Sequence, residues 1–189
     1  GCKYAVVPIQ DSVDATIKQL ESTPVTFLSY GAAEEIKISS FARENIQARD
    51  RSARVLAALA AATGGVFTCN ANKAETTVGY ATLYGDAAGF LSALADLWKF
   101  QVYDLARYLN AEVYGREVIP QGIIELVPSA ELSDAQNVDE GKGDPLHYDY
   151  HDYLFRAFVE KNLAPEDILQ AYAESCRMAF AWGCITHVQ

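Results

Sequence analysis

Residues 44–86 constrain the fold of this chain more than any other stretch of its sequence. Residues 44–63 are rich in alanine with apolar side chains at helical spacing, and they predict one long helix that the glycines at 64 and 65 end. Residues 66–68 are β-branched or aromatic, as is typical of a short buried strand. A helix followed by a buried strand and then by a polar stretch favours the α/β class with a parallel sheet.

The rest of the chain continues this alternation. Residues 4–9 predict a strand and residues 11–21 an amphipathic helix. Asp96 is a candidate N-cap for a helix that ends near Asn110. Residues 153–174 predict two helices, the second of which begins at Pro165.

Polar residues follow the predicted strand at 66–69. Asn70, Lys73 and Glu75 fall on the loop and first helical turn after its carboxyl end, where backbone N–H groups attract phosphate. Glu75 could hold a magnesium ion, and Lys73 or a nearby cation could neutralise phosphate charge. The alternative is a polar loop that merely starts a helix. The spacing by itself leaves both interpretations open.

One arginine interrupts the apolar face of the long predicted helix. At about 100° per residue, Arg49 shares a stripe with Ile46 and Leu56, whereas Arg51 and Arg54 point away. An arginine in such a place either meets a structural carboxylate or binds a ligand carboxylate or phosphate.

Lys99 and Ser129, which lie farther along the chain, also allow two interpretations each. Lys99 lies in the first turn of the helix that Asp96 is expected to cap, where a cation is unfavourable unless an anion lies nearby. A solvated lysine is the other interpretation. Ser129 either caps a helix or turn or contacts a ligand.

Composition limits the classes of protein to which the chain can belong. A chain of 189 residues, half of them hydrophobic, can bury one sizeable core. The net charge of −10 argues against binding to nucleic acid or to an anionic membrane surface. Four cysteines without paired spacing favour a reduced, cytoplasmic setting, and no apolar stretch is long enough for a membrane helix.

The segment after the strand also resembles a known family. N-A-N-K-A-E followed by T-x-V-G-Y-A-T-L-Y-G-D is similar to the G-T-G-N-K-S-E-x-x-x-G-Y-x-T-x-Y-G-D segment of NAD synthetases, particularly the glutamine-dependent type, among the N-type ATP pyrophosphatases. Residues 44–51 and 127–132 resemble the family in the same order. The similarity extends over residues 4–152.

The resemblance implies a Rossmann-like α/β fold of the adenine nucleotide alpha hydrolase type. Residues 1–152 would form part of a synthetase domain, and residues 153–189 a helical segment packed on it. The family's S-G-G-x-D-S ATP loop is not in this sequence, so we expect the C-terminal part of a synthetase domain, inactive alone, from a longer enzyme. Leu83 and Phe90 replace the substrate-binding Lys and Asp of ammonia-dependent members, which favours the glutamine-dependent type.

The activity implied by the resemblance is the ATP-dependent amidation of deamido-NAD to NAD. An acyl-adenylate forms with release of pyrophosphate, and ammonia, free or derived from glutamine, then displaces AMP. The resemblance implies magnesium as cofactor and a homodimer. It assigns Arg49 to deamido-NAD, Asn70, Lys99 and Ser129 to ATP, and Glu75 to magnesium, with no nucleophilic catalytic side chain.

Two other functions stay open at this stage. One is a related ATP pyrophosphatase that acts on GMP or modifies tRNA. The other is a catalytically inactive module that binds a dinucleotide or serves for dimerisation.

Overall fold

The computed structural model describes residues 4–26, 31, 33–130, 132, 137–140 and 142–181. The chain divides into two compact units, residues 1–145 and residues 146–189. The expected boundary between a synthetase domain and a helical segment at residue 152 stays a prediction.

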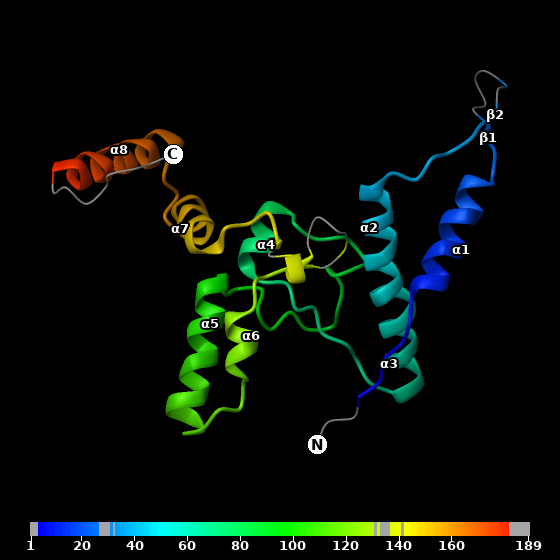
Figure 1. The fold of residues 1–189 in the computed structure, drawn as a ribbon, viewed down its shortest axis with the longest axis horizontal. Coiled ribbons are helices and arrows are strands. Elements are labelled where there is room, and N and C mark those ends of the chain that lie inside the picture. Colours follow the sequence, from blue (N-terminus) through cyan, green and yellow to red (C-terminus); the bar gives the residue numbers. More distant parts are fainter. Residues whose placement is uncertain are drawn as a thin grey trace. The chain divides into compact units, whose positions relative to one another are not determined.

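The described residues are largely helical. The first unit holds α1 (Gln10–Glu21), β1 (Val25–Thr26), β2 (Ala33–Glu34), α2 (Ser40–Arg49), η1 (Asp50–Leu56), α3 (Ala57–Thr63), α4 (Lys73–Val78), α5 (Lys99–Tyr108), η2 (Leu109–Val113), α6 (Gln121–Glu125) and η4 (Val138–Glu140) (Figure 1). The second unit holds α7 (Tyr148–Val159) and α8 (Pro165–Ala181). Within the described residues, no helix combines the length and apolar character that crossing a membrane requires.

The long predicted helix is present and runs without interruption from α2 through η1 to α3. The Ser39 hydroxyl caps its start by accepting a hydrogen bond from the Ala42 amide at 3.2 Å. Gly64 ends it with a left-handed φ of +66°, which confirms the predicted glycine stop. The middle segment, η1, is a π-helix, in which the backbone bonds from i to i+5 instead of i+4.

The wide turns of η1 change which residues face inward. The buried residues of this region are Ala48 and Ser52, whereas Arg49 is exposed. The prediction that Arg49 interrupts the buried face was therefore wrong. Leu56 of the predicted stripe is exposed as well, so apolar spacing along the helix did not mark its buried face.

A hydrogen-bonded cluster joins α1 to η1. The Ser12 hydroxyl donates to Asp50 Oδ2 at 2.8 Å, and Arg54 donates to both carboxylate oxygens of Asp50 at 2.7 Å. The Arg54 guanidinium is the main reason that the pKa of Asp50 is lowered, and burial partly opposes it. The cluster holds α1 against the helix that carries Ser52.

The predicted strands differ from what the structure shows. Residues 4–9 form no ladder and are mostly exposed, so the strand predicted there was wrong: a β-branched run becomes a strand only where a partner strand accepts its hydrogen bonds. Residues 66–69 contribute a single parallel bridge, Thr68 to Leu91. Among the described residues, the one ladder is the antiparallel pair of β1 and β2.

The bridge at Thr68 depends on a very close approach of two backbone segments. The Cys69 amide donates to Leu91 O at 2.9 Å. Gly89 has φ of +154°, and a Cβ atom added there would lie 2.3 Å from the Cys69 nitrogen. Cys69 is buried, as expected of a small core residue. Only glycine fits this crossing without displacing the backbone that leads to the polar loop.

The second unit is a pair of helices. Pro165 begins α8, as predicted, and the Ala164 amide donates to Asp167 Oδ2 at 3.2 Å in the first turn. In α7, the His147 amide donates to His151 Nδ1 at 3.0 Å, and the His151 ring stacks on Phe155 with centroids 5.6 Å apart. These contacts occupy one ring nitrogen of His151 and pack its ring within α7.

Candidate functional site

The polar segment after residue 69 begins α4 through a capping box. Asn72 is only 2% exposed, and its side chain accepts from the Glu75 amide at 3.1 Å. Glu75 returns the interaction, since its Oε2 accepts from the Asn72 amide at 2.9 Å. Part of the N-A-N-K-A-E segment is therefore a helix start. This does not exclude a ligand site, because the same turn fixes where the Glu75 carboxylate lies.

The start of α5 differs from the prediction. Asp96 is not its N-cap: the helix begins at Lys99, and the Trp98 amide is satisfied by Gln101 Oε1 at 2.9 Å. The Asp96 carboxylate is 98% exposed and instead receives Lys73 Nζ at 3.1 Å. Lys73 also lies over the fully buried Trp98 ring, 5.2 Å from its centroid. The ion pair with Asp96 and the contact with the Trp98 ring hold Lys73 in place. Lys99 occupies the first position of α5.

Ser129 lies on the loop after α6, and Asp144 holds the backbone on both sides of it. The Asp144 amide donates to Pro128 O at 2.8 Å. Asp144 Oδ1 accepts from the Ala130 amide at 2.9 Å and from the Tyr80 hydroxyl at 3.1 Å. The loop is therefore joined to Tyr80, which directly follows α4.

These segments together enclose a pocket of about 510 Å³, here called the polar pocket. Its charged lining residues are Arg51, Glu75, Asp86, Lys99 and Asp144, and its neutral polar ones include Ser52, Asn70, Tyr80 and Ser129. Four of the five residues predicted for the site, namely Asn70, Glu75, Lys99 and Ser129, line it together. They come from three separate parts of the chain.

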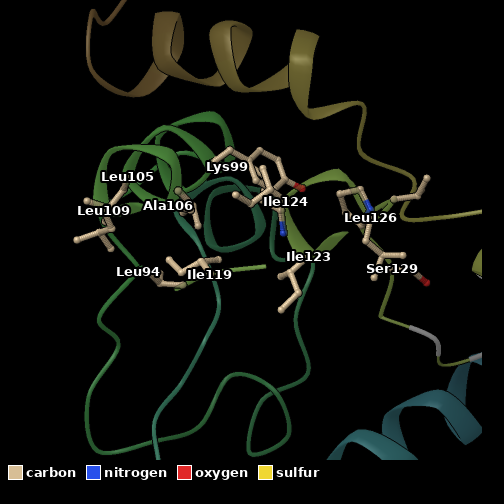
Figure 2. Close-up of a pocket in the computed structure, with 14 residues that line it drawn as sticks. Leu94, Lys99, Leu105, Ala106, Leu109, Ile119, Ile123, Ile124, Leu126 and Ser129 are labelled. Atoms are coloured by element: carbon tan, nitrogen blue, oxygen red, sulfur yellow. The ribbon is translucent and has the colours of Figure 1, made fainter. Parts of the chain in front are cut away.

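A second pocket of the same volume lies between α5 and α6 and is here called the apolar pocket. Its lining includes Leu94, Val102, Leu105, Leu109, Ile119 and Ile124. Figure 2 labels Leu94, Leu105, Leu109, Ile119 and Ile124 around it, together with Lys99 and Ser129. Because Lys99 and Ser129 also line the polar pocket, the two pockets meet at these residues.

A family model described as NAD synthase matches residues 1–179. The chain belongs to the NAD synthase family. Over 130 residues it is 42% identical to the glutamine-dependent NAD(+) synthetase of Synechocystis, which covers 69% of this chain and 22% of that relative. With the same-named enzyme of Thermotoga maritima it shares 34% identity over 168 residues, or 89% of this chain and 27% of the relative. The chain thus spans about a quarter of the length of these relatives.

A solved NAD synthetase structure supports the predicted fold class. The glutamine-dependent enzyme of Acinetobacter baumannii, solved in complex with ADP, matches 86% of this chain and 25% of its own, with a TM-score of 0.50 and 28% identity. The α/β fold of the adenine nucleotide alpha hydrolase type is therefore confirmed for this member of the NAD synthase family.

Arg49, the fifth predicted site residue, lies outside the residues that line the polar pocket. Its Nε donates to the Leu83 carbonyl at 3.1 Å. The α-helical period predicted that Arg51 points away from the apolar stripe. In the structure, Arg51 lines the polar pocket beside Ser52 and is half-buried. The sequence contained no local sign that Arg51, and not Arg49, would line the pocket, because nothing in its pattern marks a π-helical segment.

Tyr80, Asp86 and Asp144 also line the polar pocket and were not predicted. Tyr80 and Asp86 belong to the G-Y-A-T-L-Y-G-D part of the family segment, so that resemblance could have indicated them. The third, Asp144, comes from the acidic loop before residue 145, and its position depends on a contact 64 residues away in sequence, with Tyr80. Spacing along the chain contains no signal for such a contact.

The charges of the polar pocket determine which ligand it can accept. Arg51 and Lys99 supply two positive charges, and Glu75, Asp86 and Asp144 supply three negative charges. A polyphosphate would meet net repulsion here unless a divalent cation accompanied it. Among the described residues, no three His, Cys, Asp or Glu side chains gather to hold a metal by themselves. Mg²⁺ fits this arrangement, since it usually takes one or two carboxylates together with water and substrate phosphates.

Proposed function

We propose that the protein takes part in NAD biosynthesis as an NAD synthetase that amidates deamido-NAD at the expense of ATP. The proposal includes an acyl-adenylate intermediate, release of pyrophosphate and AMP, and ammonia that is free or derived from glutamine. From the family resemblance we also propose a homodimer, and from the spacing of the four cysteines a cytoplasmic location. The observation that carries the proposal is that Asn70, Glu75, Lys99 and Ser129 line a single pocket.

The chemistry asks for positioning and charge neutralisation more than for a nucleophilic side chain. A carboxylate is a poor electrophile, so the nicotinic acid group attacks the α-phosphorus of ATP and is thereby activated for attack by ammonia. Lys99 and Arg51 place positive charge at the pocket where the phosphates would lie, and the Ser129 hydroxyl and Asn70 amide add hydrogen bonds. Lys99 stands at the first position of a ten-residue helix, where the helix dipole also favours an anion.

Glu75 is the residue proposed to hold magnesium. Its carboxylate lines the pocket, and the capping box fixes the turn that carries it. A carboxylate has about four lone-pair sites, so the capping bond from the Asn72 amide uses only part of its capacity. The ion would neutralise phosphate charge and orient the triphosphate.

Arg49 is proposed to contact deamido-NAD. Its bond to the Leu83 carbonyl uses one of the five N–H donors of the guanidinium, and the side chain is exposed. The dinucleotide would then contact α2 on the face beside Leu83, outside the polar pocket.

The experiment that tests the proposal is Glu75→Gln in the natural full-length protein. Glutamine keeps an oxygen that can accept from the Asn72 amide, because Glu and Gln serve equally at this position of a capping box. We expect the free energy of unfolding to change by less than about 0.5 kcal/mol. Magnesium-dependent formation of AMP and NAD from ATP and deamido-NAD should fall by about 100-fold or more, the scale of losing an electrostatic contact to the transition state.

Asn72→Ala is the matched control. It removes the acceptor for the Glu75 amide and should cost about 1–2 kcal/mol of stability, while leaving a carboxylate at position 75. Unchanged turnover in Glu75→Gln would remove Glu75 from the site. If the wild-type protein itself forms no AMP, the inactive binding or dimerisation module becomes the better interpretation.

A further inference from the structure

Asp144 contacts the loop that carries Ser129 through both its backbone and its side chain. Its amide donates to Pro128 O at 2.8 Å, and its Oδ1 accepts from the Ala130 amide at 2.9 Å. Ser129 lies between these two anchored residues. The backbone of Ser129 is therefore held on both sides by one residue that is 15 positions away in sequence.

Tyr80 connects this arrangement to the helix that carries Glu75. Its hydroxyl donates to Asp144 Oδ1 at 3.1 Å, and its amide donates to the Glu75 carbonyl at 2.9 Å, just after the C-cap of α4 at Gly79. Asp144 and Tyr80 are both among the residues that line the polar pocket. A short chain of hydrogen bonds thus joins the Ser129 loop to the C-terminal end of α4.

Gly143 shows that the crossing of the two loop segments is tight. A Cβ atom added at Gly143 would lie 2.6 Å from Val127 Cγ1 and 2.7 Å from the Pro128 carbonyl oxygen. A contact this short with the backbone cannot be relieved by rotating a side chain. The segment that carries Asp144 and the segment that carries Ser129 are therefore packed backbone to backbone, which makes the geometry of the Asp144 contacts specific.

We propose that Asp144 is a positioning residue, which fixes the Ser129 hydroxyl at the polar pocket where it contacts the phosphates of ATP. Tyr80 in turn holds Asp144 in place relative to α4. This inference rests on the proposed function, because it uses the assignment of Ser129 to ATP. The role of Asp144 is to accept hydrogen bonds from Ala130 and Tyr80. For these two hydrogen bonds its negative charge is not required, since an amide oxygen can accept both of them.

The first test measures the geometry without any activity. Hydrogen–deuterium exchange is followed in the natural full-length protein for the peptide that spans residues 126–132. Asp144→Ala removes the acceptor of the Ala130 amide, so exchange at that amide should rise by about tenfold, whereas Asp144→Asn should leave it near the wild-type rate. Residues 10–21 of α1 serve as the internal reference, because they make no contact with this loop in the hydrogen-bond network above.

The second test measures the KM for ATP. Asp144→Ala should raise it by about tenfold and change kcat less, which corresponds to about 1.4 kcal/mol of lost binding. In Asp144→Asn, the KM for ATP should stay within about twofold of the wild-type value. Tyr80→Phe keeps the fold and removes one donor only, so it should raise the KM by about threefold and serves if Asp144→Ala does not fold.

The combination with Ser129→Ala decides whether Asp144 acts through Ser129. If it does, the double variant Ser129→Ala with Asp144→Ala should have the same KM for ATP as Ser129→Ala by itself. Additive effects would overturn the proposal, as would unchanged exchange at residue 130 in Asp144→Ala. If Ser129→Ala leaves the KM unchanged while the wild-type enzyme turns over ATP, the ATP role of Ser129 and the positioning role fail together but the proposed function does not. A wild-type protein without ATP turnover fails the proposed function first.

Discussion

The polar and apolar pockets have the same volume and share Lys99 and Ser129, yet they are built in different ways. The apolar pocket is formed by residues 94–129, which are close in sequence, and half of its lining residues lie on α5 and α6. The polar pocket draws on residues from 51 to 144, most of which lie in loops or at helix starts. Backbone hydrogen bonds and glycine crossings hold these loops in place, whereas aliphatic packing holds α5 and α6.

This difference teaches which kind of change each pocket tolerates. The polar pocket depends on backbone paths, so the most harmful substitutions are those that add atoms where two backbones cross. The apolar pocket depends on buried side chains, so the most harmful substitutions there remove atoms. Substitutions in the two pockets can test this contrast.

Gly89→Ala should have the largest effect on stability. The added Cβ would lie 2.3 Å from the Cys69 nitrogen and 2.6 Å from the Thr68 carbonyl carbon, at a φ that disfavours alanine. Strain and backbone displacement together should lower the free energy of unfolding by about 3 kcal/mol or more, measured by urea denaturation.

Gly122→Ala is the matched control for this change. It lies in α6, and an added Cβ meets nothing within 4 Å. Since alanine favours a helix over glycine, this variant should be neutral or more stable by up to about 0.5 kcal/mol. Equal effects of the two substitutions would contradict the view that backbone crossings hold the polar pocket.

Ile124→Ala should have the next largest effect. Ile124 is 6% exposed on the wall of the apolar pocket, so truncation loses buried contacts and should lower the free energy of unfolding by about 2–3 kcal/mol. Ile123→Ala is the control, because its neighbour Ile123 is 62% exposed, and the expected change is below about 0.5 kcal/mol. Similar losses at both positions would argue that aliphatic burial does not hold this pocket.

The smallest expected effect is the pH dependence that Asp50 contributes behind the polar pocket wall. Its folded-state pKa lies below the ordinary value of 3.8, mainly because of Arg54. A lowered pKa stabilises the folded state above about pH 4, and the contribution is lost as the pH falls through the folded-state pKa. Urea midpoints from pH 3 to 6 should therefore show wild type and Asp50→Asn converging below pH 4. A constant difference across this range would mean that Asp50 does not titrate as the structure implies.

The sequence predicted the helices and the location of the site better than it predicted the strands. The helices at residues 11–21 and 44–63 and the glycine stop at Gly64 follow from local periodicity and capping, and all are present. Strands depend on partners elsewhere in the chain, so the run at residues 4–9 could not be assigned from its own composition.

Within the site, the resemblance to the family indicated Asn70, Glu75, Lys99 and Ser129, which line one pocket. The capping box at Asn72 shows that the two interpretations of this segment were not exclusive, since a helix start and a pocket wall use the same residues. Arg51 and Asp144 were missed because their positions depend on a π-helical segment and on a contact with Tyr80, and neither leaves a local pattern.

The π-helical segment η1 also affects how insertions and deletions in this helix would act. A turn of π-helix holds about one residue more than a turn of α-helix, so loss of one residue within residues 50–56 can be absorbed by a return to α-helical bonding. The flanking helices α2 and α3 would keep their direction. The wall of the polar pocket would change instead, because Arg51 and Ser52 would turn to another face. In this helix, a change of length by one residue acts as a change in the binding site.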